Sequence, residues 1–183
     1  MADSPEVSLD AAAAADAGLL SNLLELYIHD LSEVFSGIQL GANGRFGYRD
    51  LALYWSEPER RFPFIIKCGS RVAGFVLVTR GSPASEDPNV FDIAEFFVIR
   101  RYRRSGVGRR AANLLWNRFS GMWIVRVSEG NRGAIPFWAR VVAEYSNGAA
   151  TEFTRPGDPH PWRVFSFASA PRGGPDRPDE GRL

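Results

Sequence analysis

Apolar side chains recur with helical spacing near the start of the chain. Between residues 19 and 38 they return every three or four positions, which predicts an amphipathic helix ending near Gly41. A shorter helical stretch is expected from Tyr48 to about Trp55, before Pro58.

Later segments alternate between strand and helix patterns. The apolar runs 62–67 and 72–79 are joined by a short Gly-containing connection and predict a hairpin. The run 90–99 is apolar on both faces apart from Asp92 and Glu95, which is typical of a central strand covered on two sides. Helical patterns are expected from 109 to 120 and from 131 to 145, and the remaining strands at 122–127, 151–154 and 162–167.

The 183 residues fit one domain with short tails. Residues 1–17 are acidic and Ala-rich, so we expect a flexible segment in which residues 5–9 supply at most one short strand. Residues 18–170 are expected to form the domain. Residues 171–183 are rich in Pro, Gly and charge, and we expect a disordered tail there.

Composition narrows the class of protein. A chain that is 45% hydrophobic and 13% aromatic must bury a core. Lys and Arg number 22 against 21 for Asp and Glu, so no bulk charge attracts nucleic acid or an anionic membrane. Cys68 is the only cysteine and histidines number two, so neither a disulfide nor a metal site is expected. Without a long apolar run or a secretory signal pattern, the expected location is the cytoplasm.

A basic, glycine-containing loop between a buried strand and a helix carries the clearest chemical signal. It reads Arg103-Arg104-Ser105-Gly106-Val107-Gly108. The first amides of a helix lack internal acceptors, and glycine lets the backbone approach a phosphate closely. The loop lacks the Gly-Lys-Ser/Thr ending of a nucleoside-triphosphate loop and the third glycine of a dinucleotide fingerprint. It therefore predicts a different anion cradle, with a nucleic-acid patch as the lesser alternative.

This loop resembles the signature of the Gcn5-related N-acetyltransferase (GNAT) family, in which Arg or Gln is followed after two residues by Gly, one residue, and Gly or Ala. The resemblance extends to Glu95 within the preceding strand, to the pattern from Asn131 to Trp138, and to the order of elements over 62–167. It implies an α/β (α+β) fold with helices flanking a mixed, mostly antiparallel sheet, splayed between its fourth and fifth strands. It also implies acetyl-CoA as cosubstrate and no metal.

The same resemblance implies where the cofactor binds. The diphosphate would lie on the amides from Arg104 to Arg109, and the backbone at Phe97 and Val98 would pair with the pantetheine arm and polarise the thioester. Arg103 and Arg104 either bind phosphates or merely cover a helix end. The full expected set is Phe97, Val98, Arg103, Arg104, Ser105, Gly106, Val107, Gly108, Arg109, Asn131 and Trp138.

Catalysis by this family implies a base, because an alkylammonium must lose a proton before it attacks. Glu95 is the candidate, since apolar neighbours desolvate it and raise its pKa; the alternative is a structural pair with an arginine. The family often places a tyrosine acid where this chain has Trp138, whose indole is no practical acid. Tyr145 could replace it, or the thiolate could leave without an acid.

The acceptor is expected to be the primary amine of a small molecule, held between aromatic and acidic side chains. The expected wall consists of Tyr27, Asp30, Glu33, Tyr48, Tyr54, Trp55 and His160. Two alternatives remain: acetylation of a protein N-terminus or lysine, and a non-catalytic module that binds acyl-CoA. A homodimer is possible.

Overall fold

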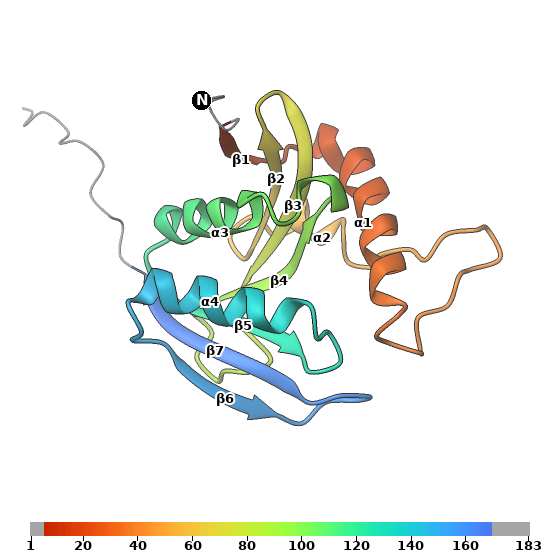
Figure 1. Ribbon diagram of the computed structural model, residues 1–183. Helices are drawn as coiled ribbons and strands as arrows, with labels where there is room; N and C mark the ends of the chain where they lie inside the picture. The colour runs from red at the N-terminus through yellow and green to blue at the C-terminus, as the bar shows by residue number, and fades with distance from the viewer. Residues whose placement is uncertain (1–5, 170–183) are drawn as a thin grey trace, which may run out of the picture.

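The structure of the protein is a computed structural model, described here for residues 6–169, which form one seven-stranded sheet with helices on both faces (Figure 1). The strands lie in the order β1-β2-β3-β4-β5-β7-β6. The strand bounds are β1 (Val7–Ala11), β2 (Arg61–Cys68), β3 (Arg71–Arg80), β4 (Phe91–Val98), β5 (Gly121–Ser128), β6 (Thr151–Arg155) and β7 (Trp162–Ser169). The helices are α1 (Ala17–Leu31), α2 (Leu53–Ser56), α3 (Val107–Arg118) and α4 (Ala134–Ser146).

The two middle strands separate soon after they pair. All neighbouring strands are antiparallel except β4 and β5, which run parallel and pair only from Phe91 to Ile93 of β4. In the pairing with β3, Leu77 is opposite Glu95 and Val78 is opposite Ile93, so Ala94 is an extra residue that bulges β4. The mixed sheet, splayed between its fourth and fifth strands, is confirmed.

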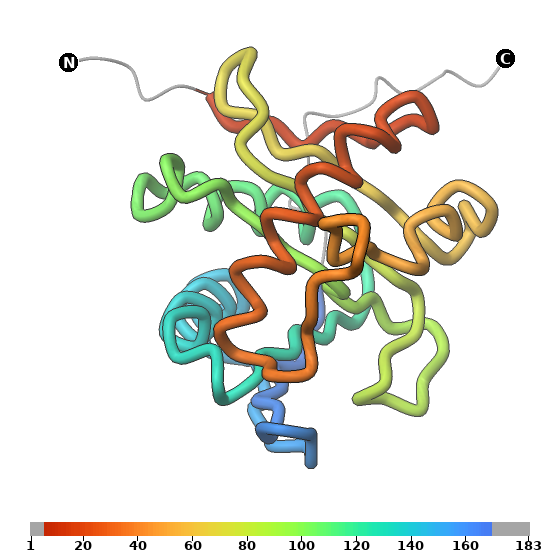
Figure 2. Tube along the Cα trace, turned by 90° about the vertical axis from the view of Figure 1, so that its right-hand side faces the viewer, coloured from red at the N-terminus to blue at the C-terminus, as the bar shows by residue number. Residues whose placement is uncertain are grey.

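Each face of the sheet packs its own core. Viewed together, Figures 1 and 2 place α3 and α4 on one side of the sheet and α1 on the other. Val107, Leu115 and Trp116 of α3 and Val141 of α4 belong to one buried cluster. Leu20, Leu23 and Leu24 of α1 belong to a second cluster, with Phe75 and Phe97 from the sheet. The central strand β4 contributes to both clusters, which fixes its position relative to α1 and α3.

Two sequence expectations need correction here, and a third is refined. The segment expected to be flexible contains the short strand expected near residues 5–9: β1 pairs with β2 over five residues because Val7 and Leu9 are buried, and a 3-10 turn at Ala14–Asp16 leads into α1. The first helix ends at Leu31 rather than near Gly41. The second is one turn, Leu53–Ser56. Residues 1–5 and the expected tail 171–183 lie outside the described residues.

The early end of α1 has a tertiary cause. Beyond Leu31 the chain makes separate turns, and the Phe35 ring stacks on Trp162 of β7 at a centroid distance of 6.0 Å. Further along, Glu25 of α1 accepts hydrogen bonds from the amides of Phe46 (2.7 Å) and Gly47 (3.0 Å). Figure 2 shows this segment, residues 32–52, crossing in front of the strands on the α1 side. Contacts with β7 and α1 thus replace continuation of the helix.

Gly74 allows β3 to approach β4 closely at the end of the gap. A Cβ atom at this position would lie 1.9 Å from the Phe97 carbonyl oxygen. Gly74→Ala is therefore expected to lower the free energy of unfolding by about 3 kcal/mol, since backbone rather than a flexible side chain must move. Urea denaturation measures this change. Gly37→Ala, with nothing within 4 Å of the new methyl group, is the matched control, and equal losses in both variants would contradict the assignment.

Candidate functional site

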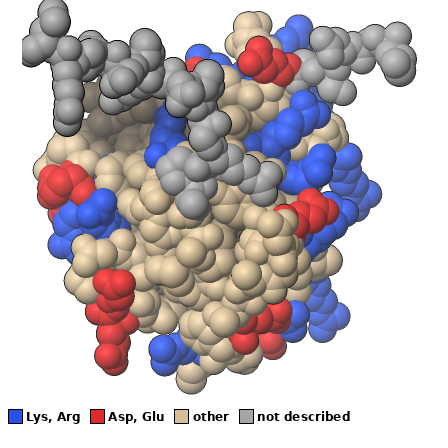
Figure 3. Space-filling model, turned by 90° about the vertical axis from the view of Figure 1, so that its left-hand side faces the viewer, with Lys and Arg blue, Asp and Glu red and all other residues tan. Residues whose placement is uncertain are grey.

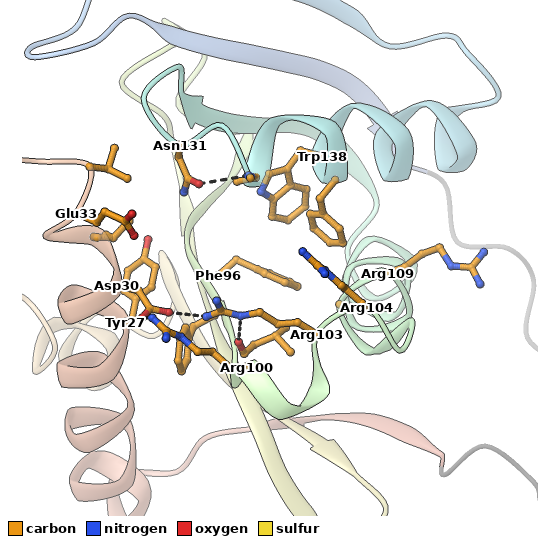
Figure 4. Close-up of a pocket in the computed structure, with 18 of the residues that line it drawn as sticks. Tyr27, Asp30, Glu33, Phe96, Arg100, Arg103, Arg104, Arg109, Asn131 and Trp138 are labelled. Carbon is orange, nitrogen blue, oxygen red and sulfur yellow. Dashed lines mark hydrogen bonds and ion pairs between the residues drawn. The ribbon is translucent and has the colours of Figure 1, made fainter.

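A cavity of about 540 Å³ lies where the ends of β4 and α1 meet the N-termini of α3 and α4 (Figure 4). Its lining includes nine of the eleven residues expected for the cofactor: Phe97, Val98, Arg103, Arg104, Gly106, Gly108, Arg109, Asn131 and Trp138. Three expected acceptor residues, Tyr27, Asp30 and Glu33, line it too. Twelve of the residues expected for the cofactor and the acceptor thus line one continuous cavity.

The loop before α3 presents its backbone to this cavity. Arg104 and Gly106 have φ values of 61° and 83°, in the left-handed region, so the chain turns sharply before the helix begins at Val107. The amides of the first helical turn have no acceptor within the helix. A Cβ on Gly108 would lie 3.2 Å from the Phe137 ring and 3.6 Å from Val98 Cγ2. Bare backbone at the N-terminus of a helix suits a diphosphate.

Two members of the expected cofactor set do not line the cavity with their side chains. The hydroxyl of Ser105 donates to the Tyr102 carbonyl at 2.7 Å, which braces the loop. Val107 is only 2% exposed and belongs to the core beneath the sheet. Both can serve this site through their backbone.

Arg103 is held by the protein itself. Its Nε donates to the Val98 carbonyl at 2.7 Å, and one of its terminal nitrogens lies 2.6 Å from Asp30. Arg100 donates to the other oxygen of Asp30, also at 2.6 Å (Figure 4). Burial raises the pKa of Asp30, but the hydrogen bonds from Arg103 and Arg100 outweigh it and leave the pKa below its usual value. Asp30, expected to contact the acceptor, lines the cavity and also ties α1 to the loop after β4 through these two ion pairs.

The remaining arginines at the cavity differ in direction. Figure 4 shows Arg104 pointing toward α4 and Arg109 pointing away from the other labelled side chains. Arg109 lies 3.6 Å from Glu144. Arg140 of α4 lines the cavity as well. Basic side chains also gather along one edge of the face shown in Figure 3. Arg104 is thus the best-placed side chain for a phosphate.

Glu95 lies just behind the cavity wall and is bound by two tyrosines. Tyr27 donates to its Oε2 at 2.7 Å and Tyr48 to its Oε1 at 3.1 Å. Burial raises the pKa of Glu95, and the two phenolic hydrogen bonds oppose the rise without cancelling it. Among the described residues no arginine forms an ion pair with Glu95. Arg126 pairs instead with Asp92, at 2.8 and 2.9 Å. The carboxylate therefore has the environment of a base rather than that of a structural salt bridge.

Four expected site residues lie elsewhere. Tyr54 is 2% exposed in the core, where burial raises its pKa to about 12, and Trp55 donates to the Ala12 carbonyl at 3.0 Å. Tyr145 donates to Asn117 at 3.0 Å in a separate cavity of about 210 Å³ between α3 and α4. His160 packs against Gly130, whose added Cβ would lie 2.3 Å from its ring. Tyr54 shows the general reason, because aromatic side chains at helical spacing serve cores as readily as pockets.

Other lining residues were missed. They are Leu31, Val34, Phe96, Arg100, Gly133, Ala134, Phe137 and Arg140. A signal existed for α4, because Gly133, Phe137 and Arg140 follow one another at helical steps of four and three and so share a face. Pro136 does not interrupt this helix, since it lies in the first turn, where its missing N–H has no intrahelical role.

Outside the cavity lining, aromatic rings and one ion pair connect the segment 32–52 with β7, β5 and β4. Phe35 stacks on Trp162, and the Arg126 guanidinium lies 5.6 Å from the centroid of the Trp162 ring. Asp92, which holds Arg126, is fully buried and also accepts a hydrogen bond from Ser82. The segment 32–52 and β7 therefore meet over the side of the gap that faces α1.

Residues 6–169 contain no group of three or more His, Cys, Asp or Glu side chains that could hold a metal ion. In the same range, no helix has the length and apolar character needed to cross a bilayer.

Comparison with known proteins assigns the fold to a family. The model of the acetyltransferase (GNAT) family matches residues 23–142, which span α1 to α4 and the whole cavity. The chain belongs to the GNAT family. No curated protein matches its sequence.

Solved structures share the GNAT fold at low identity. An acetyltransferase from Thermus thermophilus is 17% identical with a TM-score of 0.65, covering 88% of this chain and 96% of its own. Spermidine N-acetyltransferase from Vibrio cholerae, in complex with CoA and spermine, is 12% identical with a TM-score of 0.58 and coverages of 89% and 95%. A ribosomal-protein alanine N-acetyltransferase from Escherichia coli is 13% identical with a TM-score of 0.56 and coverages of 94% and 99%. GNAT proteins of this architecture thus include enzymes named for small and for protein acceptors.

Proposed function

We propose that this GNAT protein is an acetyl-CoA-dependent N-acetyltransferase that acetylates the primary amine of a small molecule, with Glu95 as general base. One observation carries the proposal. A single cavity has the bare backbone of the α3 N-terminus at one end and, at the other, Tyr27, which is hydrogen-bonded to Glu95.

The lining fits acetyl-CoA along its length. The first-turn amides of α3, together with Arg104, match a diphosphate. β4 pairs with β5 only as far as Ile93, so the edge of Phe96, Phe97 and Val98 that faces the gap has no strand partner. Peptide groups on such an edge suit the pantetheine amides, and an amide there can polarise the thioester carbonyl. The bound cosubstrate supplies an acetyl carbon for an amine arriving from the side of Tyr27.

The chain supplies a base, and the tyrosine that lines the cavity among the described residues, Tyr27, is hydrogen-bonded to that base. Glu95 has its pKa raised toward neutrality by burial, which suits proton removal from an ammonium. Trp138 is 7% exposed and makes edge-to-face contact with Phe96 at 4.9 Å, so it acts as a wall. The departing thiolate needs no acid, because its pKa is near that of an ordinary thiol, about 8.5.

A small acceptor is favoured over a protein by the segment 32–52. The Phe35 ring of this segment stacks on Trp162. The backbone amides of Phe46 and Gly47 in the same segment donate hydrogen bonds to Glu25 of α1. An extended peptide would have to displace these contacts, whereas a small amine would not. Asp30 is engaged by two arginines, which leaves Glu33 as the carboxylate of this wall that no arginine pairs with among the described residues.

Turnover decides between the alternatives. The protein is incubated with acetyl-CoA and, in turn, spermine, tyramine, glucosamine or a hexapeptide with a free N-terminal alanine. Released CoA thiol and acetylated product are both measured. We expect release with at least one small amine and less than about a tenth of that rate with the peptide. Faster transfer to the peptide would indicate a protein acceptor, and no transfer at all would favour the acyl-CoA-binding module.

Gly108→Trp is expected to abolish the rise in melting temperature that acetyl-CoA causes in the wild type. An indole at this position would fill the space between α3, Phe137 and Val98, where the diphosphate would bind. At about 100 times Kd, the wild type should gain about 2.7 kcal/mol. Differential scanning fluorimetry with and without acetyl-CoA measures the shift.

Gly18→Trp is the matched control, because its side chain enters open space at the start of α1. It should retain the full shift. A shift that survives in Gly108→Trp would place the cofactor elsewhere, and no shift in the wild type would remove the basis of the proposal.

A further inference from the structure

Tyr27 stands between the cavity and Glu95. Its side chain lines the cavity, whereas Glu95 does not, and its hydroxyl donates to Glu95 Oε2 at 2.7 Å. Building on the proposed function, we propose that the Tyr27 hydroxyl relays the proton from the acceptor ammonium to Glu95, so that the base acts without touching the acceptor.

The position of this hydroxyl is fixed by packing. The Tyr27 ring makes an edge contact with Phe75 at 5.7 Å and lies 5.9 Å from the Phe97 ring. Phe97 belongs to the part of β4 that has separated from β5, so the hydroxyl is held beside the strand end that faces the gap. Figure 4 shows Tyr27 reaching from α1 toward the same space as Glu33. A rigid hydroxyl between two partners is the geometry of a relay.

The direction of the hydrogen bond sets the direction of proton flow. Because the Tyr27 hydroxyl donates to Glu95, its oxygen lone pairs are available to a donor in the cavity. Burial raises the pKa of Tyr27 well above its usual value, and the adjacent Glu95 charge raises it further, so a free phenolate does not form. Tyr27 must therefore accept one proton while it gives up another.

The step balances without any further reactant. The ammonium gives a proton to Tyr27 Oη as the phenolic proton moves to Glu95 Oε2, which leaves a neutral amine, an unchanged tyrosine and a protonated carboxyl group. The amine lone pair then forms the C–N bond with the acetyl carbon, the C–S bond breaks, and its electrons leave with the CoA thiolate. The second nitrogen proton passes to solvent or to the thiolate.

Tyr48 offers a comparison within the same network. It donates to the other oxygen of Glu95 at 3.1 Å but does not line the cavity. Tyr48 is thus a positioning residue, and its loss should alter the pKa of Glu95 without interrupting the path. Arg126 and Asp92 on β5 and β4, and Tyr54 on α2, are the other titratable groups that act on this network. All three are unchanged in the variants below.

The test compares Tyr27→Phe with Tyr48→Phe, each of which loses one hydroxyl and keeps its ring. Two primary amines are used: tyramine, or whichever basic amine the turnover panel identifies, and trifluoroethylamine, which is already unprotonated at neutral pH. For the basic amine, Tyr27→Phe should lower kcat about 100-fold and leave the KM for acetyl-CoA within about twofold. For trifluoroethylamine the loss should be less than about tenfold. Tyr48→Phe should lower kcat less than about fivefold for either amine, with the acid limb of the pH profile moved upward.

The outcomes separate the relay from the proposed function. Transfer by the wild type together with equal losses for both amines in Tyr27→Phe would overturn the relay and assign Tyr27 a packing role. Retention of activity in Tyr27→Phe would also overturn it and leave the acetyltransferase proposal standing. No transfer by the wild type to any amine would end both proposals. The double variant Tyr27→Phe/Glu95→Gln is then compared with the two single variants. If its kcat is no lower than that of the slower single variant, the result supports the two residues acting as one unit.

Discussion

Glu95→Gln is expected to lower kcat/KM for the amine by a factor on the order of 10²–10⁴, the usual contribution of a general base. The amide keeps an oxygen for the tyrosine hydroxyls but cannot accept the proton. In the wild type, the acid limb of the pH profile should lie above the usual range for glutamate, because burial raises the pKa of Glu95. That limb should disappear in the variant. Steady-state kinetics between pH 5 and 9 at saturating acetyl-CoA measures both effects.

The same substitution carries its own control for folding. Burial raises the pKa of the Glu95 carboxyl group in the folded state above its unfolded-state pKa of about 4.3. The folded protein therefore loses stability as the pH rises from the unfolded-state pKa through the folded-state pKa and the group ionises. Glu95→Gln removes that cost and should melt a few degrees higher than the wild type at pH 8, with the difference shrinking toward pH 4. Unchanged turnover, or a variant that melts lower at pH 8, would contradict the role given to this carboxylate.

Asp92→Asn is expected to lower the free energy of unfolding by about 3 kcal/mol, because it leaves the partly buried Arg126 guanidinium without its counter-charge. Asp92 is fully buried, and Arg126 binds both of its oxygens, at 2.8 and 2.9 Å. The pair lies where β4 and β5 still run together, just before they separate at Ile93. Urea denaturation followed by circular dichroism measures the loss.

Asp10→Asn is the matched control, since it removes the same charge from a solvent-exposed pair with Lys67. Its effect should be much smaller, as exposed ion pairs are screened and add little. Similar losses in the two variants would show that the Asp92–Arg126 pair does not secure the base of the gap.

The parts of the fold that sequence predicted are those whose signals are local. The two-faced apolar run around Glu95 correctly indicated a central strand, and the loop at Gly106 correctly indicated the start of a helix. The end of α1 could not be predicted in this way. The apolar residues between 32 and 38 keep helical spacing, but the Phe35 ring stacks on Trp162, which is distant in the chain. Tertiary packing there outweighs helical periodicity.

In the candidate site, too, features with a local sequence signal were predictable and contacts between distant residues were not. The sharp loop before α3 and its exposed first-turn backbone were predictable because glycine spacing and helix polarity are local properties. The Tyr27–Glu95 bond was not, because its partners are 68 positions apart and no local pattern links a phenol on a helix with a carboxylate on a strand. Asp30 shows the same limit. Its carboxylate lines the cavity, but its ion pair with Arg103, 73 positions later in the chain, has no local signal in the sequence.

The bulge at Ala94 connects these local and distant features. One extra residue in β4 changes which way the following side chains point, so that Glu95 and Phe97 both face α1 and its Tyr27. The same strand then leaves β5, which exposes the edge proposed for pantetheine. The position of the proposed base and the opening of the gap proposed for the cofactor thus arise within five residues of one strand.

Hydrogen–deuterium exchange with and without acetyl-CoA tests the central claim most directly, because it reports on the backbone amides themselves. Slower exchange is expected at residues 104–109 and at the end of β4, residues 96–98, with little change in β6. Gly108→Trp should show no such protection. The contradicting result is that saturating acetyl-CoA leaves the amides of residues 104–109 exchanging as fast as in the free protein, or that it protects only a different surface. In that case the cosubstrate does not bind at the α3 N-terminus, and the proposed acetyl transfer with proton relay through Tyr27 to Glu95 is wrong.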